Sequence, residues 1–318
     1  MAEVRRALRS AVFRHENDFG IDPRSEALRL PALSVSCVVP YYETGALAWA
    51  CVDRLAAALD RYVSAHAATP ATQIVVVDDG SGRRPFVAGA RDVRVVRMPE
   101  NQGRSAARNA GLRASADFDV TLFVDSDVLV PGDLVVRVCE LWDSGAERLS
   151  ARAAVVAGLF VTVSSWLAST DVEAVLAAAC VTADWRWRCR YQPSWIGTPS
   201  DWLYVDQVFE LVRGTDFFRQ WCGMVGPWAL PNMVLGGCFG VPTRLAIDVG
   251  GFDESFAAYG FTETSLVARL IAAGVPVIPQ VKAAAVHVEA NPAHHSRGER
   301  NALFRAAHRR FFREFMSR

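Results

Sequence analysis

Short apolar segments alternate with helical segments between residues 34 and 124, and polar side chains follow several of the apolar segments directly. The apolar segments are rich in β-branched residues and have the length of strands, and they are residues 34–39, 73–77, 93–96 and 120–124. Residues 48–67 and 104–116 carry apolar or small residues at helical spacing. This alternation predicts an α/β fold with a mostly parallel sheet and helices on both faces, whose carboxyl edge is the expected ligand site.

The second half of the sequence is less regular. It predicts further strands at 155–163, 275–278 and 283–288 and helices at 171–180 and 263–273, separated by a segment rich in Trp, Gly and Pro at 185–231. Seven of the nine Trp lie there or just before it: Trp166, Trp185, Trp187, Trp195, Trp202, Trp221 and Trp228. Indole rings stack on the C–H faces of sugars, but they also build cores, so we expect most to be core and one or two to line a cleft.

The composition excludes several classes of function. Thirty-four basic residues balance thirty-four acidic ones, so no overall charge attracts nucleic acid. No apolar run approaches the roughly 18 residues that span a bilayer, and residues 1–30 have no segment of signal-peptide character. The seven Cys are scattered and never form a C-x-x-C pair. We therefore expect buried free thiols in a reducing, cytoplasmic protein.

The strongest single chemical signal is Asp125-Ser126-Asp127, which follows the apolar segment 120–124. Two carboxylates in one crevice repel each other unless they are solvated or share a cation. Mg²⁺ and Mn²⁺ bind one or two carboxylates and complete their coordination with phosphate oxygens. The pattern favours a divalent metal site, and its alternative is a solvated turn.

Two further polar segments follow or precede expected elements. Asp78-Asp79-Gly80-Ser81 ends the segment 73–77, where an Asp can accept a hydrogen bond from a nucleobase or simply shape a β-turn. The string Asn101-Gln-Gly-Arg-Ser-Ala-Ala-Arg-Asn-Ala-Gly111 opens a helix near Arg104. A helix N-terminus with Arg nearby suits a diphosphate, and a capped surface helix is the alternative.

Taken together, these segments resemble the family-2 glycosyltransferases, which have the GT-A fold. Pro40-Tyr41-Tyr42-Glu43 is similar to the opening Pro-x-Tyr-Asn of that family, with Glu in place of Asn, and the resemblance extends over roughly 34–290. It implies that Asp78 contacts the uracil of a UDP-sugar, and that Asp127 is a more direct metal ligand than Asp125. The residues that it assigns to the donor are Pro40, Tyr42, Glu43, Asp78, Asp79, Gly103, Arg104, Arg108, Asp125 and Ser126.

The resemblance continues into the second half. Gly236-Gly-Cys-Phe-Gly240, the Gly250-Gly-Phe-Asp-Glu254 segment and Leu266-Val-Ala-Arg-Leu270 are similar to the acceptor region of these enzymes. This alignment places Glu263 over the catalytic base of the family. The family has two adjacent acids at this point and the chain has one, so a shift of one residue would place Thr264 over the base instead. Glu263 is also an ordinary helix N-terminal residue.

Two features near the C-terminus have several interpretations. His287 lies in an expected strand, where the resemblance implies a third metal ligand beside Asp125 and Asp127, and a buried core His is the alternative. The tail is rich in Arg and Phe and is expected to form a basic amphipathic helix. It could contact an anionic membrane surface, or close over the diphosphate through Arg297 and the His294-His295 loop. The interpretation that we favour is a helix docked by its Phe side chains.

The sequence thus predicts an enzyme that transfers a sugar with inversion from a nucleotide-sugar donor, assisted by Mn²⁺ or Mg²⁺. The acceptor is unassigned: a glycan, a natural product or a peptide side chain. The alternatives are a nucleotidyltransferase on a similar scaffold and an inactive protein that binds nucleotide-sugars. The expected organisation is an N-terminal extension (1–33), a nucleotide-sugar-binding half (34–145), an acceptor-binding half (146–290) and a C-terminal amphipathic helix (291–318).

Overall fold

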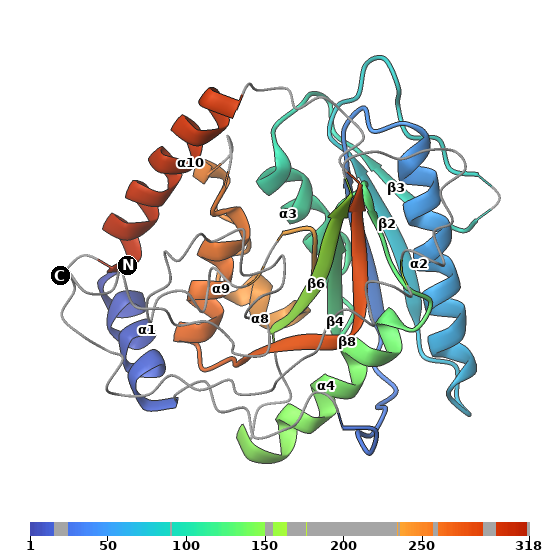
Figure 1. The fold of residues 1–318 in the computed structure, drawn as a ribbon, viewed down its shortest axis with the longest axis horizontal. Helices are drawn as coiled ribbons and strands as arrows, with labels where there is room; N and C mark the ends of the chain where they lie inside the picture. Colours follow the sequence, from blue (N-terminus) through green and yellow to red (C-terminus); the bar gives the residue numbers. More distant parts are fainter. Residues whose placement is uncertain are drawn as a thin grey trace.

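The computed structural model describes residues 1–15, 25–89, 91–149, 155–163, 176, 234, 236–256, 260–288 and 297–316. In these residues one sheet of eight strands forms the centre, in the order β3-β2-β1-β4-β7-β6-β8-β5 (Figure 1). The strands are β1 (Val35–Tyr41), β2 (Thr72–Asp78), β3 (Arg94–Arg97), β4 (Val120–Val124), β5 (Val128–Leu129), β6 (Val155–Val163), β7 (Cys238–Pro242) and β8 (Val277–Val288). Strands from before and after residue 145 therefore share one sheet.

The first four predicted strands are confirmed as a parallel unit. β1 pairs in parallel with β2 and β4, and β2 pairs in parallel with β3. The register places Tyr41 beside Asp78 at the carboxyl ends of β1 and β2. These strands are mostly buried and apolar, and the polar segments follow their carboxyl ends, which lie at one edge of the sheet.

Helices cover both faces of this unit. The described helices are α1 (Ala2–His15), α2 (Ala46–Ser64), α3 (Arg104–Ala114), α4 (Leu134–Leu149), α8 (Thr243–Asp248), the 3₁₀ turn η4 (Glu254–Phe256), α9 (Thr262–Ala272), α10 (Arg297–Phe311) and the π-helical turn η5 (Phe312–Met316). α2 and α3 both pack on β1 and β2, and they lie on opposite sides of these strands in Figure 1. The predicted helices at 48–67, 104–116 and 263–273 are confirmed, with ends shifted by a few residues.

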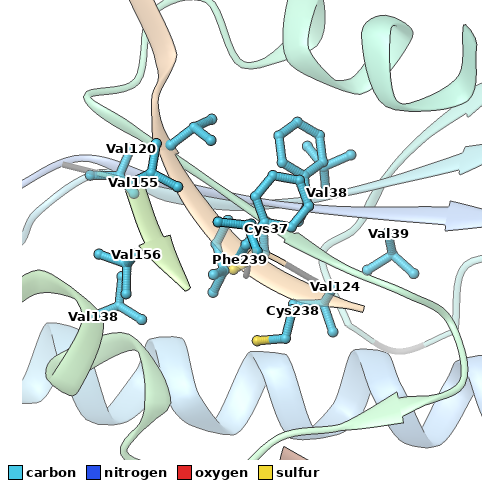
Figure 2. Close-up of a cluster of buried hydrophobic side chains, with 14 of the residues drawn as sticks. Cys37, Val38, Val39, Val120, Val124, Val138, Val155, Val156, Cys238 and Phe239 are labelled. Carbon is cyan, nitrogen blue, oxygen red and sulfur yellow. The ribbon is translucent and has the colours of Figure 1, made fainter. Parts of the chain in front are cut away.

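The hydrophobic core lies on both faces of β1, β4, β7 and β6, between these strands and the helices that cover them. Figure 2 shows Cys37, Val38, Val124, Cys238 and Phe239 among the side chains of this cluster. All five are at most 1% exposed. Because β7 contributes to this core from the second half of the chain, the core ties that half to β1 and β4.

Three elements differ from the prediction. The expected strands at 275–278 and 283–288 are one strand, β8, in which Pro279 pairs in register with Ala157 of β6. The register shifts further along, between Gly158 and Phe160 of β6. The segment Cys238–Pro242, expected as part of a Gly-rich turn, is the fully buried strand β7. The helix α4 had no sequence prediction at all.

The C-terminal helix packs against the rest of the protein through its Phe side chains, which is the interpretation that we favoured. Phe311 and Phe315 are buried, and the ring centroid of Phe261 lies 5.2 Å from that of Phe304 and 5.3 Å from that of Phe311. On the opposite flank the Arg310 guanidinium lies 4.8 Å from the ring centroid of Phe256. The helix α10 is thus fixed against the segment that precedes α9. The predicted lid at His294-His295 lies outside the described residues.

The described cysteines are free and buried, as predicted: Cys37, Cys51, Cys139 and Cys238. Burial raises the pKa of the Cys139 thiol to about 12, and burial together with the charge of Asp125 raises the pKa of Cys238 to about 12. These thiols are therefore protonated near neutral pH and act as small apolar core groups.

Candidate active site

Asp78 ends β2, and its carboxylate is enclosed by the protein. Oδ1 accepts a hydrogen bond from the backbone N–H of Ser81 at 2.9 Å, and Oδ2 accepts from the backbone N–H of Phe86 and from Nη2 of Arg97, both at 2.9 Å. The side chain has no exposed surface. These contacts give Asp78 the turn-shaping role that the sequence left open, while its contact with a nucleobase stays a prediction.

Asp79 fixes the loop before α3. Its two carboxylate oxygens accept hydrogen bonds from the backbone N–H groups of Gln102 and Gly103, at 2.8 and 2.9 Å. Gly80 makes this approach feasible, because it has a φ of 70° and a Cβ there would lie 2.3 Å from the backbone carbon of Glu100. The motif Asp78-Asp79-Gly80 therefore joins the end of β2 to the start of α3.

The loop after β1 is held in a similar way. Glu43 has a φ of 54°, and its Oε1 accepts hydrogen bonds from the backbone N–H groups of Gly82 and Arg83. The bond from Arg83 is the main cause that lowers the pKa of Glu43 below its usual value. The hydroxyl groups of Thr44 and Ser126 form a hydrogen bond of 2.7 Å. Because Ser126 lies between Asp125 and Asp127, this bond connects the loop to both carboxylates. Tyr42, which directly follows the end of β1 and lies two residues after Pro40, is 39% exposed.

Asp125 lies between two guanidinium groups. Oδ1 accepts a hydrogen bond from Nη2 of Arg108 at 2.8 Å, and Oδ2 lies 3.8 Å from Nη1 of Arg104. Burial opposes ionisation of this carboxyl group, but the charges of Arg104 and Arg108 outweigh it and lower the pKa of Asp125. Asp125 is therefore an ionised group whose oxygens already face cations of the protein.

Asp127 and His287 face each other. Oδ2 of Asp127 lies 3.4 Å from Nε2 of His287, because β5 pairs Val128 directly with His287 of β8. Their side chains are 38% and 24% exposed, respectively. No group of three or more His, Cys, Asp or Glu side chains suited to a metal occurs among the described residues. The structure thus brings two of the three predicted ligands together and directs Asp125 elsewhere.

Arg108 is placed differently from our expectation. The sequence predicted a contact with the donor, but the Arg108 side chain has no exposed surface and its guanidinium lies against Phe239 and Phe252. Nη2 donates to Asp125 and to the backbone oxygen of Gly236, at 2.8 and 2.6 Å. The acceptor oxygens of Asp125, Gly236 and Glu263 compensate the buried charge of Arg108. Arg104 at the start of the helix keeps a half-exposed side chain.

Glu263 lies in the first turn of α9, and it contacts Arg108 from the side opposite to Asp125. Oε2 is 3.4 Å from Nη1 of Arg108 and accepts a hydrogen bond from Oγ1 of Thr262. Thr262 Oγ1 in turn accepts from Nη1 of Arg108 at 3.2 Å. The preceding Phe261 has a φ of 61°, a conformation that is costly for a bulky residue and that α10 holds through its aromatic contacts.

Asn109 joins the two halves, and Arg269 ties α9 to the preceding loop of the second half; the sequence predicted neither contact. Nδ2 of Asn109 donates to the oxygen of Phe252 at 2.9 Å and to Oε1 of Glu254 at 2.8 Å. Nη1 of Arg269 donates to the oxygen of Val249 at 2.9 Å. Both residues belong to segments that carried the family resemblance. Their polar side chains on otherwise apolar helix faces were the available signal.

A prediction follows for Asp78. Asp78→Ala is expected to lower the free energy of unfolding by about 3 kcal/mol, because three donors lose a buried charged partner. Urea unfolding measures this change, with the exposed Asp117→Ala as the matched control. A change below about 1 kcal/mol together with a raised donor KM would instead assign Asp78 to the nucleobase.

The arrangement defines a class of protein. A parallel α/β unit carries ionised Asp125 and the Asp127–His287 pair at its carboxyl edge, and one buried Arg connects it to an acid at the start of a helix in the second half. The mostly parallel sheet with helices on both faces has the GT-A fold. No described helix has both the length and the apolar character needed to cross a membrane.

Comparison with known proteins shows what the chain resembles. Residues 36–156 match the family model described as Glycosyl transferase family 2. The mannosyltransferase PcManGT from Pyrobaculum calidifontis, solved with GDP-Man and Mn²⁺, superimposes with a TM-score of 0.50 at 17% identity, over 100% of this chain and 77% of that one. S. aureus TarS 1-349, solved with UDP-GlcNAc, gives 0.47 at 16% identity, over 88% and 67% of the two chains. No curated protein sequence matches significantly.

Proposed function

We propose that this protein is a family-2 glycosyltransferase, which transfers a sugar from a nucleotide diphosphate donor, with inversion, to an acceptor nucleophile that Glu263 deprotonates. The observation that carries the proposal is the proximity of the two sides of the site. One guanidinium, that of Arg108, contacts both Asp125 and Glu263, so the donor edge of the sheet and the candidate base are neighbours. The solved complex of PcManGT with GDP-Man supports a nucleotide-sugar as the donor class.

The residues present fit a divalent cation. Oδ2 of Asp127 and Nε2 of His287 lie 3.4 Å apart at the edge of the sheet where the donor is proposed to bind. Carboxylate and imidazole are both ligands of Mn²⁺, so Asp127 and His287 are the residues that would hold such a cation. A cation bound there stabilises the negative charge of the departing diphosphate. Asp125 is the lesser candidate as a ligand because Arg104 and Arg108 already neutralise it.

The reaction then follows from the chain's own residues. Glu263 accepts the proton of the acceptor nucleophile, whose lone pair attacks the anomeric carbon of the sugar. The bond from that carbon to the diphosphate oxygen breaks on the opposite face, and the electron pair leaves with the diphosphate. A single displacement of this kind inverts the anomeric centre. The residues proposed to surround the donor are those at the ends of β1, β2 and β4, including Tyr42, Asp79, Gly103 and Ser126.

A thermal-shift panel tests the donor class. UDP- and GDP-sugars are each added with MnCl₂, and at about a hundred times its Kd a bound donor adds about 2.7 kcal/mol to the free energy of unfolding. We expect one nucleotide-sugar to raise the melting temperature more than the free sugar or the free nucleoside does. A panel in which free nucleoside triphosphates stabilise the protein and nucleotide-sugars do not would favour a nucleotidyltransferase.

A further inference from the structure

Arg108 is a fully buried charge at the junction of the two halves of the site. A guanidinium without exposed surface is costly unless hydrogen bonds and opposite charges compensate it. If Arg108 served only to fill space, an apolar residue would do so at a lower cost in free energy, because Phe239 and Phe252 lie on either side of this position. The hydrogen-bond partners of the guanidinium therefore indicate what the charge does.

The two terminal nitrogens of Arg108 point to different sides of the site. Nη2 donates to Oδ1 of Asp125 at the end of β4, at 2.8 Å. Nη1 donates to Oγ1 of Thr262 at 3.2 Å and lies 3.4 Å from Oε2 of Glu263 at the start of α9. The guanidinium is planar and rigid, so it fixes the spacing between these carboxylates as no flexible side chain can. Thr262 completes the arrangement because its hydroxyl donates to the same Oε2.

Gly236 shows how closely this network is enclosed. A Cβ at Gly236 would lie 2.8 Å from Nη2 of Arg108 and 2.9 Å from Oε2 of Glu263. The backbone oxygen of the same residue accepts a hydrogen bond from Nη2. Any side chain at this position would displace the guanidinium or the Glu263 carboxylate.

We propose that Arg108 is a positioning residue that holds Glu263 at a fixed place relative to the donor edge, with Thr262 and Gly236 as its supports. The proposal rests on the proposed function, in which Glu263 is the base. Arg108 does not contact the donor and does not exchange protons. Through Nη1 and the Thr262 hydroxyl it fixes the rotamer of Glu263, so that Oε1 remains directed toward the acceptor.

Three variants test the proposal. Thr262→Val removes the shared hydroxyl with little change in shape, Gly236→Ala adds the intruding Cβ, and Arg108→Lys keeps the charge without the rigid fork. The control for the added methyl group is Gly132→Ala, because a Cβ there meets no atom within 4 Å. The readouts are melting temperature, donor Kd by titration calorimetry, and kcat for hydrolysis of the nucleotide-sugar that gives the largest thermal shift.

We expect kcat to fall about tenfold in Thr262→Val and Gly236→Ala, the loss of one hydrogen bond to a charged group, while the donor Kd changes less than about twofold. Arg108→Lys is expected to lose about a hundredfold. If Arg108→Lys does not fold, the other two variants carry the test. Thr262→Val should add nothing to Glu263→Gln, since the hydroxyl acts only through the carboxylate. A merely structural role predicts additive effects.

The outcomes separate this proposal from the proposed function. If Thr262→Val and Gly236→Ala keep wild-type kcat while Glu263→Gln loses it, the positioning role is wrong and the base remains. If donor affinity falls in parallel with kcat in folded Thr262→Val and Gly236→Ala, the network serves donor binding and the proposal is overturned. If Glu263→Gln keeps wild-type kcat, the base assignment and the positioning role are both wrong.

Discussion

Glu263→Gln is expected to fold normally, to bind donor and metal as the wild type does, and to lose at least about a hundredfold in kcat, the lower end of general-base effects. Gln preserves the size of the side chain and an oxygen for the Thr262 hydroxyl, but it does not accept a proton from the acceptor. An alcohol acceptor should show the largest loss. A thiol acceptor, which is partly ionised near neutral pH, should lose less, so the size of the effect also reports the nucleophile.

The matched control for this variant is Glu140→Gln, which removes a carboxylate that pairs with Arg137 on α4. It should keep wild-type kcat. Near wild-type kcat in Glu263→Gln with an alcohol acceptor would refute the assignment. The next candidates would be Asp253 and Glu254, although Asp253 accepts a hydrogen bond from the N–H of Ser255 and Glu254 from Asn109.

The first half of the fold was predictable because its signals are local. Apolar β-branched runs that end in Asp or Pro identify β1, β2 and β4, and periodicity identifies α2 and α3. The second half depends on partners that are distant in the sequence. β7 is a strand because it inserts between β4 and β6, and its Gly-rich sequence gives no such indication. β8 is one strand because both of its expected parts pair with β6, on either side of a shift in register.

The candidate site was predictable as a set of residues but not as a set of contacts. Asp127 and His287 lie 160 residues apart in the chain, and only the pairing of β5 with β8 brings them together. Asp78 and Arg108 are in the predicted motifs, yet both side chains are buried and bonded within the protein. Motif spacing does not reveal burial, because burial depends on the whole core. The Trp residues between 166 and 228 lie outside the described part of the chain.

Asp127→Ala is expected to abolish transfer and to weaken nucleotide-sugar binding in the presence of Mn²⁺. Without Asp127 the site loses its divalent cation, and the diphosphate loses the positive charge that stabilises it by several kcal/mol in such sites. The expected loss in kcat/KM is therefore on the order of a hundredfold or more. His287→Ala should lose activity in the same direction. The control is Asp133→Ala, which removes a carboxylate that pairs with Arg137 and leaves the Asp127–His287 pair intact.

The most direct test of the account is the identity and metal dependence of the products. The wild-type protein, incubated with MnCl₂ and the nucleotide-sugar that gives the largest thermal shift, should release nucleoside diphosphate and transfer the sugar with inversion at the anomeric carbon. EDTA or Asp127→Ala should stop that release. Full activity in EDTA and in Asp127→Ala, or release of nucleoside monophosphate or pyrophosphate in place of nucleoside diphosphate, would contradict a metal-assisted sugar transfer at this site.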